Sequence, residues 1–138
     1  MESMEELESG STLRLDFEKS AEVARIGGVV PCAVQDVDTG EVVLVAYVNA
    51  EALERAVETR SAVFWSTSRN ELWKKGKTSG HTFELVEVRV NCEQNCVLYR
   101  VRPRRGGICH TKNRAGEARN CFYRRLDFAT RRLENTDP

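Results

Sequence analysis

The sequence lacks any apolar run near the ~20 residues that a membrane-spanning helix requires, and its longest candidate, VVLVAYV, has the length of a strand. Its first residues, MESMEELESGS, are acidic, whereas a secretory leader has a basic start and an apolar stretch, so we do not expect export. Internal repeats and low-complexity tracts are absent as well. We therefore expect a cytoplasmic protein without a membrane partner.

The sequence also has no net charge, since 21 basic residues balance 21 acidic ones. The balance is uneven along the chain: from Val97 to the C-terminus, 11 Lys and Arg stand against 4 Asp and Glu. A basic half of this kind can meet a phosphate-bearing ligand or a nucleic acid. The alternative is a solvated surface whose charge the acidic N-terminal half balances.

The chain has 138 residues, which is enough for one domain to bury a core without disulfides. With 41% hydrophobic and 30% charged residues, the composition is typical of a globular protein. We expect a flexible acidic tail over residues 1–12, a single domain over residues 13–128 and a C-terminal tail over residues 129–138.

Local patterns in the first half predict a hairpin followed by a helix. The stretch VVPCAVQDVDTGEVVLVAYV contains two Val-rich strands joined by a turn from Asp36 to Gly40. In NAEALERAVETR, Leu53, Ala56 and Val57 recur at helical spacing, and Asn49 is a plausible N-cap. SAVFWSTS predicts a third strand, and RNELWKKGKTSG has the composition of an exposed polar loop.

The second half predicts further antiparallel strands. Val86, Val88 and Val90 alternate with charged residues, which indicates a half-buried strand that runs to Cys92. CVLYRVR is expected to be its antiparallel partner, and GGICHTKNRAGEARNCFYRRL a long loop ending in a short strand from Cys121. The fold class is therefore α+β, a mainly antiparallel sheet with one or two helices.

Five cysteines in a reducing compartment favour buried, metal-binding or catalytic thiols over disulfides. Thiolates and imidazole suit zinc better than magnesium, so Cys92, Cys109, His110 and Cys121 are candidate ligands. Adjacent residues seldom bind one ion together, which leaves His110 free to transfer protons. Cysteine spacing alone leaves open that these thiols are buried or idle.

The remaining Cys, His and Trp residues have simpler interpretations. Cys32, in the apolar stretch VVPCAV, is expected in the core, and Cys96 is expected to pack at the start of a strand. Trp65 and Trp73 are of a type that usually packs in the core, although a Trp near STSR can also stack on a planar base. His81 lies at a loop exit, where a solvent-exposed or hydrogen-bonded role is common.

Four motifs taken in order resemble the phosphoribosyl-AMP cyclohydrolase family of histidine biosynthesis: VVPCAVQDVDTGEVVLVAYVNAEAL, FWSTSRNELWKKGKTSGH, CHT and CF. The resemblance spans about residues 16–126. It implies an intertwined homodimer with composite active sites at the interface. It also implies zinc held by Cys92, Cys109 and Cys121, with His110 as general base or proton shuttle.

The reaction implied by the resemblance opens the purine ring of 1-(5-phosphoribosyl)-AMP at the N1–C6 bond, through attack of a zinc-bound hydroxide. The STSR and KGKTSGH segments would line the nucleotide pocket, and Arg69, Lys75 and Lys77 are the nearest cations for the phosphates. The residues expected to bind substrate are Trp65, Ser66, Ser68, Arg69, Trp73, Lys75, Lys77, Thr78, Ser79 and His81.

Two features depart from the family. The three aspartates usually credited with a magnesium ion are Asn91, Glu93 and Asn95 here, so magnesium is expected to bind weakly or not at all, with Glu93 as a ligand of a weak second metal. The gap between the last two zinc cysteines contains 11 residues and is longer than usual, because the loop over residues 112–119 widens it.

Two alternatives stay open, and the departures motivate the first of them. One is a divergent family member that keeps zinc and acts on a different nucleotide or heterocyclic substrate in specialised metabolism. The other is a non-enzymatic, zinc-stabilised module that binds nucleic acid through its basic C-terminal half.

Overall fold

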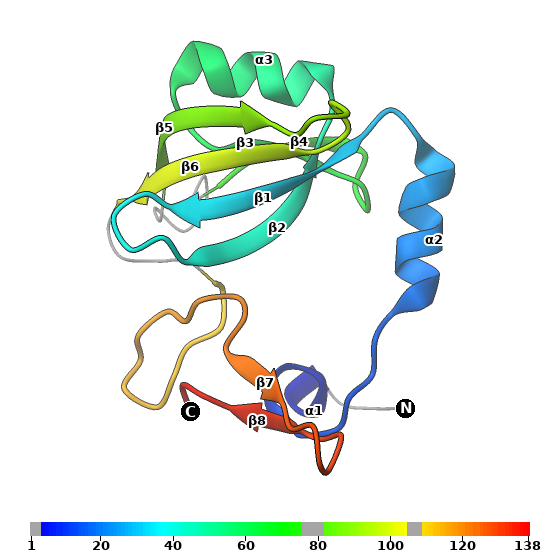
Figure 1. The fold of residues 1–138 in the computed structure, drawn as a ribbon, viewed down its shortest axis with the longest axis vertical. Coiled ribbons are helices and arrows are strands. Elements are labelled where there is room, and N and C mark those ends of the chain that lie inside the picture. Colours follow the sequence, from blue (N-terminus) through cyan, green and yellow to red (C-terminus); the bar gives the residue numbers. More distant parts are fainter. Residues whose placement is uncertain (1–3, 76–81, 105–108) are drawn as a thin grey trace.

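The protein is built around a four-stranded sheet with the strand order β2, β1, β6, β5. The computed structural model describes residues 4–75, 82–104 and 109–138. The strands of the sheet are β1 (Val30–Asp36), β2 (Val42–Val48), β5 (Phe83–Val90) and β6 (Val97–Pro103). β1 and β6 pair in parallel, and the other two pairs are antiparallel. The predicted α+β class with a mainly antiparallel sheet is confirmed (Figure 1).

The hairpin and helix of the first half form as predicted. Backbone N–H of Asp38 donates to the Asp36 carboxylate at 2.8 Å, and Gly40 has a φ of 80°, so the β1–β2 turn uses residues suited to reversal. Helix α3 (Ala50–Thr59) begins after Asn49, whose side chain accepts from Ala52 N at 2.8 Å. Its buried residues are alanines, whereas Val57 is 48% exposed.

The expected polar loop after residue 66 contains a strand, and that prediction is wrong. β3 (Val63–Ser66) pairs in an antiparallel manner with β4 (Glu71–Lys74). β4 is short and charged at both ends, so its apolar residues are too few to produce a strand signal. The pair is joined to the main sheet by Ala62 N, which donates to Phe83 O at 3.1 Å.

The core face of β5 also differs from the expectation. The pairing with β6 shifts register between Leu85 and Glu87, and this irregularity changes which residues face the core. Phe83 and Leu85 are buried, whereas Val86 and Val90 are 41% and 52% exposed. The strand was therefore predicted correctly, but of its three valines only Val88 packs partly buried against the core.

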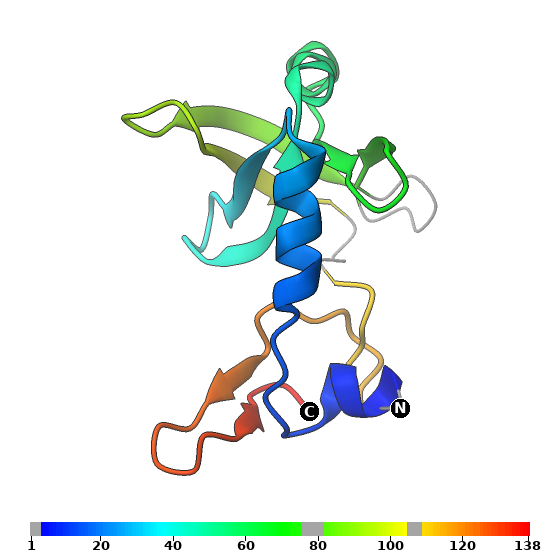
Figure 2. The ribbon, with the colours of Figure 1, turned by 90° about the vertical axis from the view of Figure 1, so that its right-hand side faces the viewer.

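The two ends of the chain lie together below the sheet, where Figures 1 and 2 show α1, β7 and β8 as neighbours. α1 (Met4–Ser9) and α2 (Phe17–Ile26) were not expected, and β7 (Arg124–Leu126) starts after Cys121. β7 pairs with β8 (Leu133–Asn135). Both segments assigned to tails thus contain regular structure, while the domain limits themselves stay a prediction.

The hydrophobic core lies between the sheet, α3 and the β3–β4 pair. Its largest fully buried side chains include Tyr99, Phe64 and Phe83, and the Phe64 ring lies 5.6 Å from Tyr99 and 5.1 Å from Trp73. Cys32 is fully buried, as predicted, and this burial raises the pKa of its thiol to about 12. Within the described ranges, no helix is both long enough and apolar enough to span a membrane.

Candidate functional site

Two of the three predicted zinc ligands lie together in the loop between β6 and β7. The side chains of Cys109 and Cys121 interact electrostatically, so their sulfurs are neighbours. The loop is anchored where Cys121 N donates to Val43 O at 3.1 Å and Cys109 N donates to Arg119 O at 2.8 Å. Desolvation of its sulfur, followed by the charge of Cys109, raises the pKa of Cys121 to about 11, although the residue as a whole is exposed.

Two groups beside this cysteine pair stabilise negative charge on sulfur and so oppose the effect of burial on Cys121. The hydroxyl of Thr111 donates to Sγ of Cys109 at 3.2 Å. Burial lowers the pKa of Lys75, and the charges of Cys109 and Cys121 oppose this shift, so the ammonium group lies within electrostatic reach of both sulfurs. A hydroxyl donor and a cation beside two thiols stabilise the thiolate form, which is the form that binds zinc. The donor set of the cysteine pair therefore fits zinc.

His110 lies beside the cysteine pair with its two ring nitrogens in different surroundings. Nδ1 is 4.0 Å from Sγ of Cys109, and Nε2 is 2.5 Å from a carboxylate oxygen of Glu8. The His110 side chain is 81% exposed. An exposed imidazole next to the sulfurs is well placed to exchange protons with a bound water or substrate.

Cys92 lies away from this pair. It belongs to the turn that closes the β5–β6 hairpin at its Val90–Val97 end, whereas β6 leads toward Cys109 from the opposite end (Figures 1 and 2). Strands of this length extend roughly 25 Å. Within the described ranges of one chain, no three His, Cys, Asp or Glu side chains form a group that could hold a metal ion.

The turn from Asn91 to Cys96, here called the amide turn, holds its shape through its own side chains. Oδ1 of Asn91 accepts from the backbone N–H groups of Asn95 and Cys96 at 3.0 and 2.9 Å. Nδ2 of Asn91 donates to Oδ1 of Asn95 at 2.7 Å, and Nδ2 of Asn95 donates to Glu93 at 3.4 Å. The side chains of Asn91, Glu93 and Asn95, which would have to bind a cation, already accept hydrogen bonds within the turn. Of the three, only Glu93 has a carboxylate. This donor set does not fit magnesium.

The residues expected to bind substrate occupy separate places. Ser66, Ser68 and Arg69 cluster where β3 meets β4, with Ser66 Oγ 3.4 Å from Nε of Arg69. Lys75 follows the other end of β4, beside the cysteine pair. Trp65 and Trp73 pack partly buried against the core. Four predicted positions lie outside the described residues: Lys77, Thr78, Ser79 and His81.

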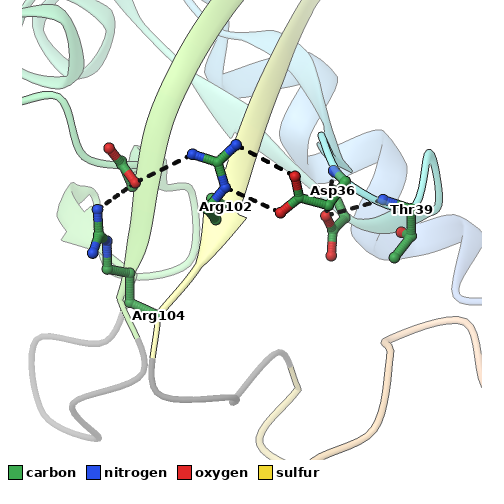
Figure 3. Close-up of polar contacts among 6 residues, drawn as sticks. Asp36, Thr39, Arg102 and Arg104 are labelled. Atoms are coloured by element: carbon green, nitrogen blue, oxygen red, sulfur yellow. Dashed lines mark hydrogen bonds and ion pairs between the residues drawn. The ribbon is translucent and has the colours of Figure 1, made fainter.

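Several basic residues of the C-terminal half are paired with acidic residues from earlier in the chain. Arg102 donates to both carboxylate oxygens of Asp38 at 3.0 and 3.3 Å, and Arg104 pairs with Glu84 (Figure 3). Arg100 donates a single hydrogen bond to a carboxylate oxygen of Glu87 at 2.7 Å. These pairs support the interpretation that the charge is balanced across the fold rather than collected for a nucleic acid.

The inserted loop over residues 112–119 is a short hairpin in which Lys112 bridges Ala118. Asn113 fixes its tip, because its side chain accepts from Glu117 N at 2.9 Å and donates to Asp137 at 3.0 Å. The insertion thus reaches the C-terminal end of the chain. The insertion lies between Cys109 and Cys121 in the chain, next to the cysteine pair.

Sequence reasoning missed three residues of this region. Glu8 was assigned to a tail and Thr111 was seen only as part of the CHT motif. Arg119 is 6% exposed, its guanidinium lies 4.4 Å from the Tyr123 ring, and among the described residues its Nε has no hydrogen-bond partner. The basic character of the loop was visible in the sequence, but nothing in the pattern marked this arginine as buried.

Comparison with known proteins gives a consistent result. The family described as phosphoribosyl-AMP cyclohydrolase matches residues 44–123. A phosphoribosyl-AMP cyclohydrolase of Hyphomonas neptunium is 49% identical over 100 residues, which cover 72% of each chain. One of Caulobacter vibrioides is 52% identical over 101 residues, covering 72% of this chain and 69% of the relative. A bifunctional histidine biosynthesis protein of Thermus thermophilus is 54% identical over 99 residues, covering 72% and 44%.

Proposed function

Since the chain belongs to the phosphoribosyl-AMP cyclohydrolase family, we propose that it hydrolyses the N1–C6 bond of 1-(5-phosphoribosyl)-AMP, a step of histidine biosynthesis. The observation that carries the proposal is the pairing of Cys109 with Cys121 beside His110 and Lys75. Sulfur ligands, a proton-transfer group and a cation for an anionic substrate meet in one loop region, as a hydrolase of this type requires.

Cys109 and Cys121, with Cys92 as third ligand, would hold a zinc ion. Three protein ligands leave a fourth coordination position open, which is the arrangement of catalytic rather than structural zinc sites. When bound, zinc is a Lewis acid that activates water for attack near neutral pH. Thr111, through its hydrogen bond to Cys109, would orient the sulfur and limit its charge.

His110 would accept the proton that the attacking water loses. The water oxygen forms a bond to C6 of the purine, the N1–C6 bond breaks, and N1 takes up a proton, so the overall reaction consumes one water. His110 can return the proton it received, because it is next to the sulfur of Cys109 and its side chain is exposed. Lys75 offers an ammonium group for a substrate phosphate.

The third ligand would come from a second copy of the chain. Cys92 and the cysteine pair lie toward opposite ends of the β5–β6 hairpin. Reciprocal exchange of Cys92 between two copies completes both sites at once, which is the symmetry expected of a homodimer with a self-complementary interface. The composite active site is therefore a property of the dimer in this proposal.

Magnesium has no part in the proposed reaction. The amide turn uses its oxygens for internal hydrogen bonds and carries one carboxylate in place of three. Neutral amides and a single carboxylate bind a hard divalent cation poorly. We therefore propose an enzyme that needs zinc alone.

A second candidate function is supported by the same turn and by the inserted hairpin. Both the amide turn and the inserted hairpin depart from the family pattern near the cysteines that would hold zinc. Differences of this kind change the substrate of an enzyme more readily than its fold. In this alternative the chain keeps zinc and His110 but hydrolyses a different nucleotide or heterocycle.

Purified protein tests these proposals directly. The zinc-loaded enzyme should turn over phosphoribosyl-AMP without added magnesium, and Cys109→Ser should lose both zinc and activity. Cys32→Ser, at a buried cysteine away from the site, is the matched control for zinc content. Bound zinc with no turnover of phosphoribosyl-AMP would reject the first candidate in favour of the second, and a folded protein that binds no zinc would reject both.

A further inference from the structure

Glu8 lies on α1, outside residues 44–123 that match the family, and contacts His110 across 102 positions of sequence. Its carboxylate oxygen is 2.5 Å from Nε2 of the ring, and its side chain is 30% exposed. We propose that Glu8 is a positioning residue that holds the His110 ring with Nδ1 directed toward the cysteine pair. The catalytic consequence rests on the function proposed above.

The segment that carries Glu8 is fixed by several independent contacts. The hydroxyl of Tyr123 donates to the backbone carbonyl of Glu8. Arg124 donates to Gly10 O at 3.1 Å, and backbone N–H of Leu133 donates to Ser11 O at 2.7 Å. Tyr123 and Arg124 follow Cys121 closely in the chain, and Leu133 lies on β8, which pairs with β7. The element that carries the cysteine pair therefore also places the carboxylate, which is how a supporting residue is held in register with a site.

The contact decides which ring nitrogen can accept a proton. An ionised carboxylate only accepts hydrogen bonds, so Nε2 must carry the proton in this contact. In a neutral imidazole the other nitrogen is then the acceptor, and Nδ1 is the atom that lies 4.0 Å from Sγ of Cys109. Without Glu8, the ring could rotate and either nitrogen could carry the proton. Glu8 thus selects Nδ1 as the proton acceptor that faces the cysteines.

Nitrogen-15 NMR of the histidine rings tests the tautomer without any activity measurement. The chain has two histidines, so a His81→Gln variant assigns the signals of His110. In the zinc-loaded wild-type protein we expect the proton on Nε2, and in Glu8→Ala a mixture of both tautomers. A proton on Nδ1 in the wild type, or an unchanged tautomer in Glu8→Ala, overturns the proposal even if the enzyme acts on phosphoribosyl-AMP as proposed.

Steady-state kinetics tests the consequence for the reaction. Supporting carboxylates of this kind contribute ~10–100-fold to activity, so Glu8→Ala should lower kcat at least ~10-fold while KM changes by less than about twofold. Glu8→Gln keeps an acceptor oxygen and should recover part of the loss. Glu5→Ala, an exposed position on the same helix, is the matched control and should leave kcat unchanged.

The outcomes separate the two proposals. A rise in KM at constant kcat in Glu8→Ala would mean that Glu8 contacts substrate, and unchanged kinetics would mean that it has no role; either result overturns the positioning role. Equal losses in Glu8→Ala and Glu5→Ala would also overturn it, since the effect would then come from α1 as a whole. Absence of cyclohydrolase activity in the wild type refutes the proposed function, and the NMR result then decides the tautomer alone.

Discussion

The hydroxyl of Thr111 donates a 3.2 Å hydrogen bond to the sulfur of Cys109, two residues earlier in the chain. Hydrogen bonds to a ligand sulfur orient it and reduce its charge, and outer residues of this kind change metal affinity ~10–100-fold. We expect Thr111→Val to weaken zinc binding by about 10-fold and Thr111→Ser to preserve it. Competition with a chromogenic chelator measures both, and equal affinity of Thr111→Val and the wild type would show that the hydrogen bond is irrelevant to zinc.

The amide turn predicts how the protein responds to divalent cations. The wild type should show no saturable binding of Mn²⁺, a magnesium substitute, by electron paramagnetic resonance, because its oxygens accept internal hydrogen bonds. The double variant Asn91→Asp with Asn95→Asp restores three carboxylates with Glu93 and should bind at least ~10-fold tighter. Gln94→Glu, which adds one charge elsewhere in the turn, is the control. Wild-type binding as tight as that of the double variant would contradict the prediction.

The buried hydroxyl of Tyr99 gives a prediction for stability. It donates to the carbonyl of Val63 at 3.0 Å and joins β6 to β3 inside the core. Tyr99→Phe removes the donor and leaves a buried carbonyl without it, so the free energy of unfolding should fall by about 1–2 kcal/mol. Urea denaturation measures the change. The control is Tyr47→Phe, at a tyrosine that is partly exposed. No difference between the two variants would mean that the carbonyl finds another donor.

Local sequence patterns were sufficient for the elements whose signals are local. The β1–β2 turn and the Asn49 cap each depend on residues within a few positions of one another, and both form as predicted. β4 was missed because its four residues are too few to show the alternation of apolar and polar residues that predicts a strand. It is a strand through its pairing with β3. The exposure of Val86 and Val90 in β5 was not predicted, because the irregularity beside Leu85 arises from pairing with β6, which periodicity cannot reveal.

The candidate site shows the same division. The motif resemblance selected Cys109, Cys121 and His110, and the fold brings these three together. Glu8 could not be found from the sequence, because an acidic run at a chain end has no pattern that distinguishes one glutamate from the next. Its contact depends on how the two ends of the chain pack beneath the sheet, which is a tertiary feature.

Carboxylates paired with arginines predict the acid response. Hydrogen bonds from Arg102 hold the pKa of Asp38 below its ordinary value of 3.8, and Arg89, followed by Arg100, lowers that of Glu87 from 4.5. The folded state then binds fewer protons than the unfolded state in acid. The stability from these pairs is present above the ordinary pKa values and is lost as the pH falls through the lowered ones.

The urea midpoint should therefore decrease as the pH falls below about 4.5. Asp38→Asn should make the decrease shallower, because it removes one of the titrating groups. Glu51→Gln, on α3, is a charge-matched control. An identical pH slope in Asp38→Asn and the wild type would refute the contribution of the Asp38 pair.

The most direct test of the composite zinc site is complementation between two inactive variants, Cys92→Ser and Cys109→Ser. Each alone lacks a ligand in every site. If a site takes Cys92 from one copy and the cysteine pair from the other, a mixed dimer contains one intact site, so random mixing restores zinc and cyclohydrolase activity in about a quarter of all sites. Co-expression of differently tagged chains, followed by double affinity purification, should yield mixed dimers with half of the wild-type zinc and activity. Mixed dimers that bind no zinc and remain inactive would contradict the composite site.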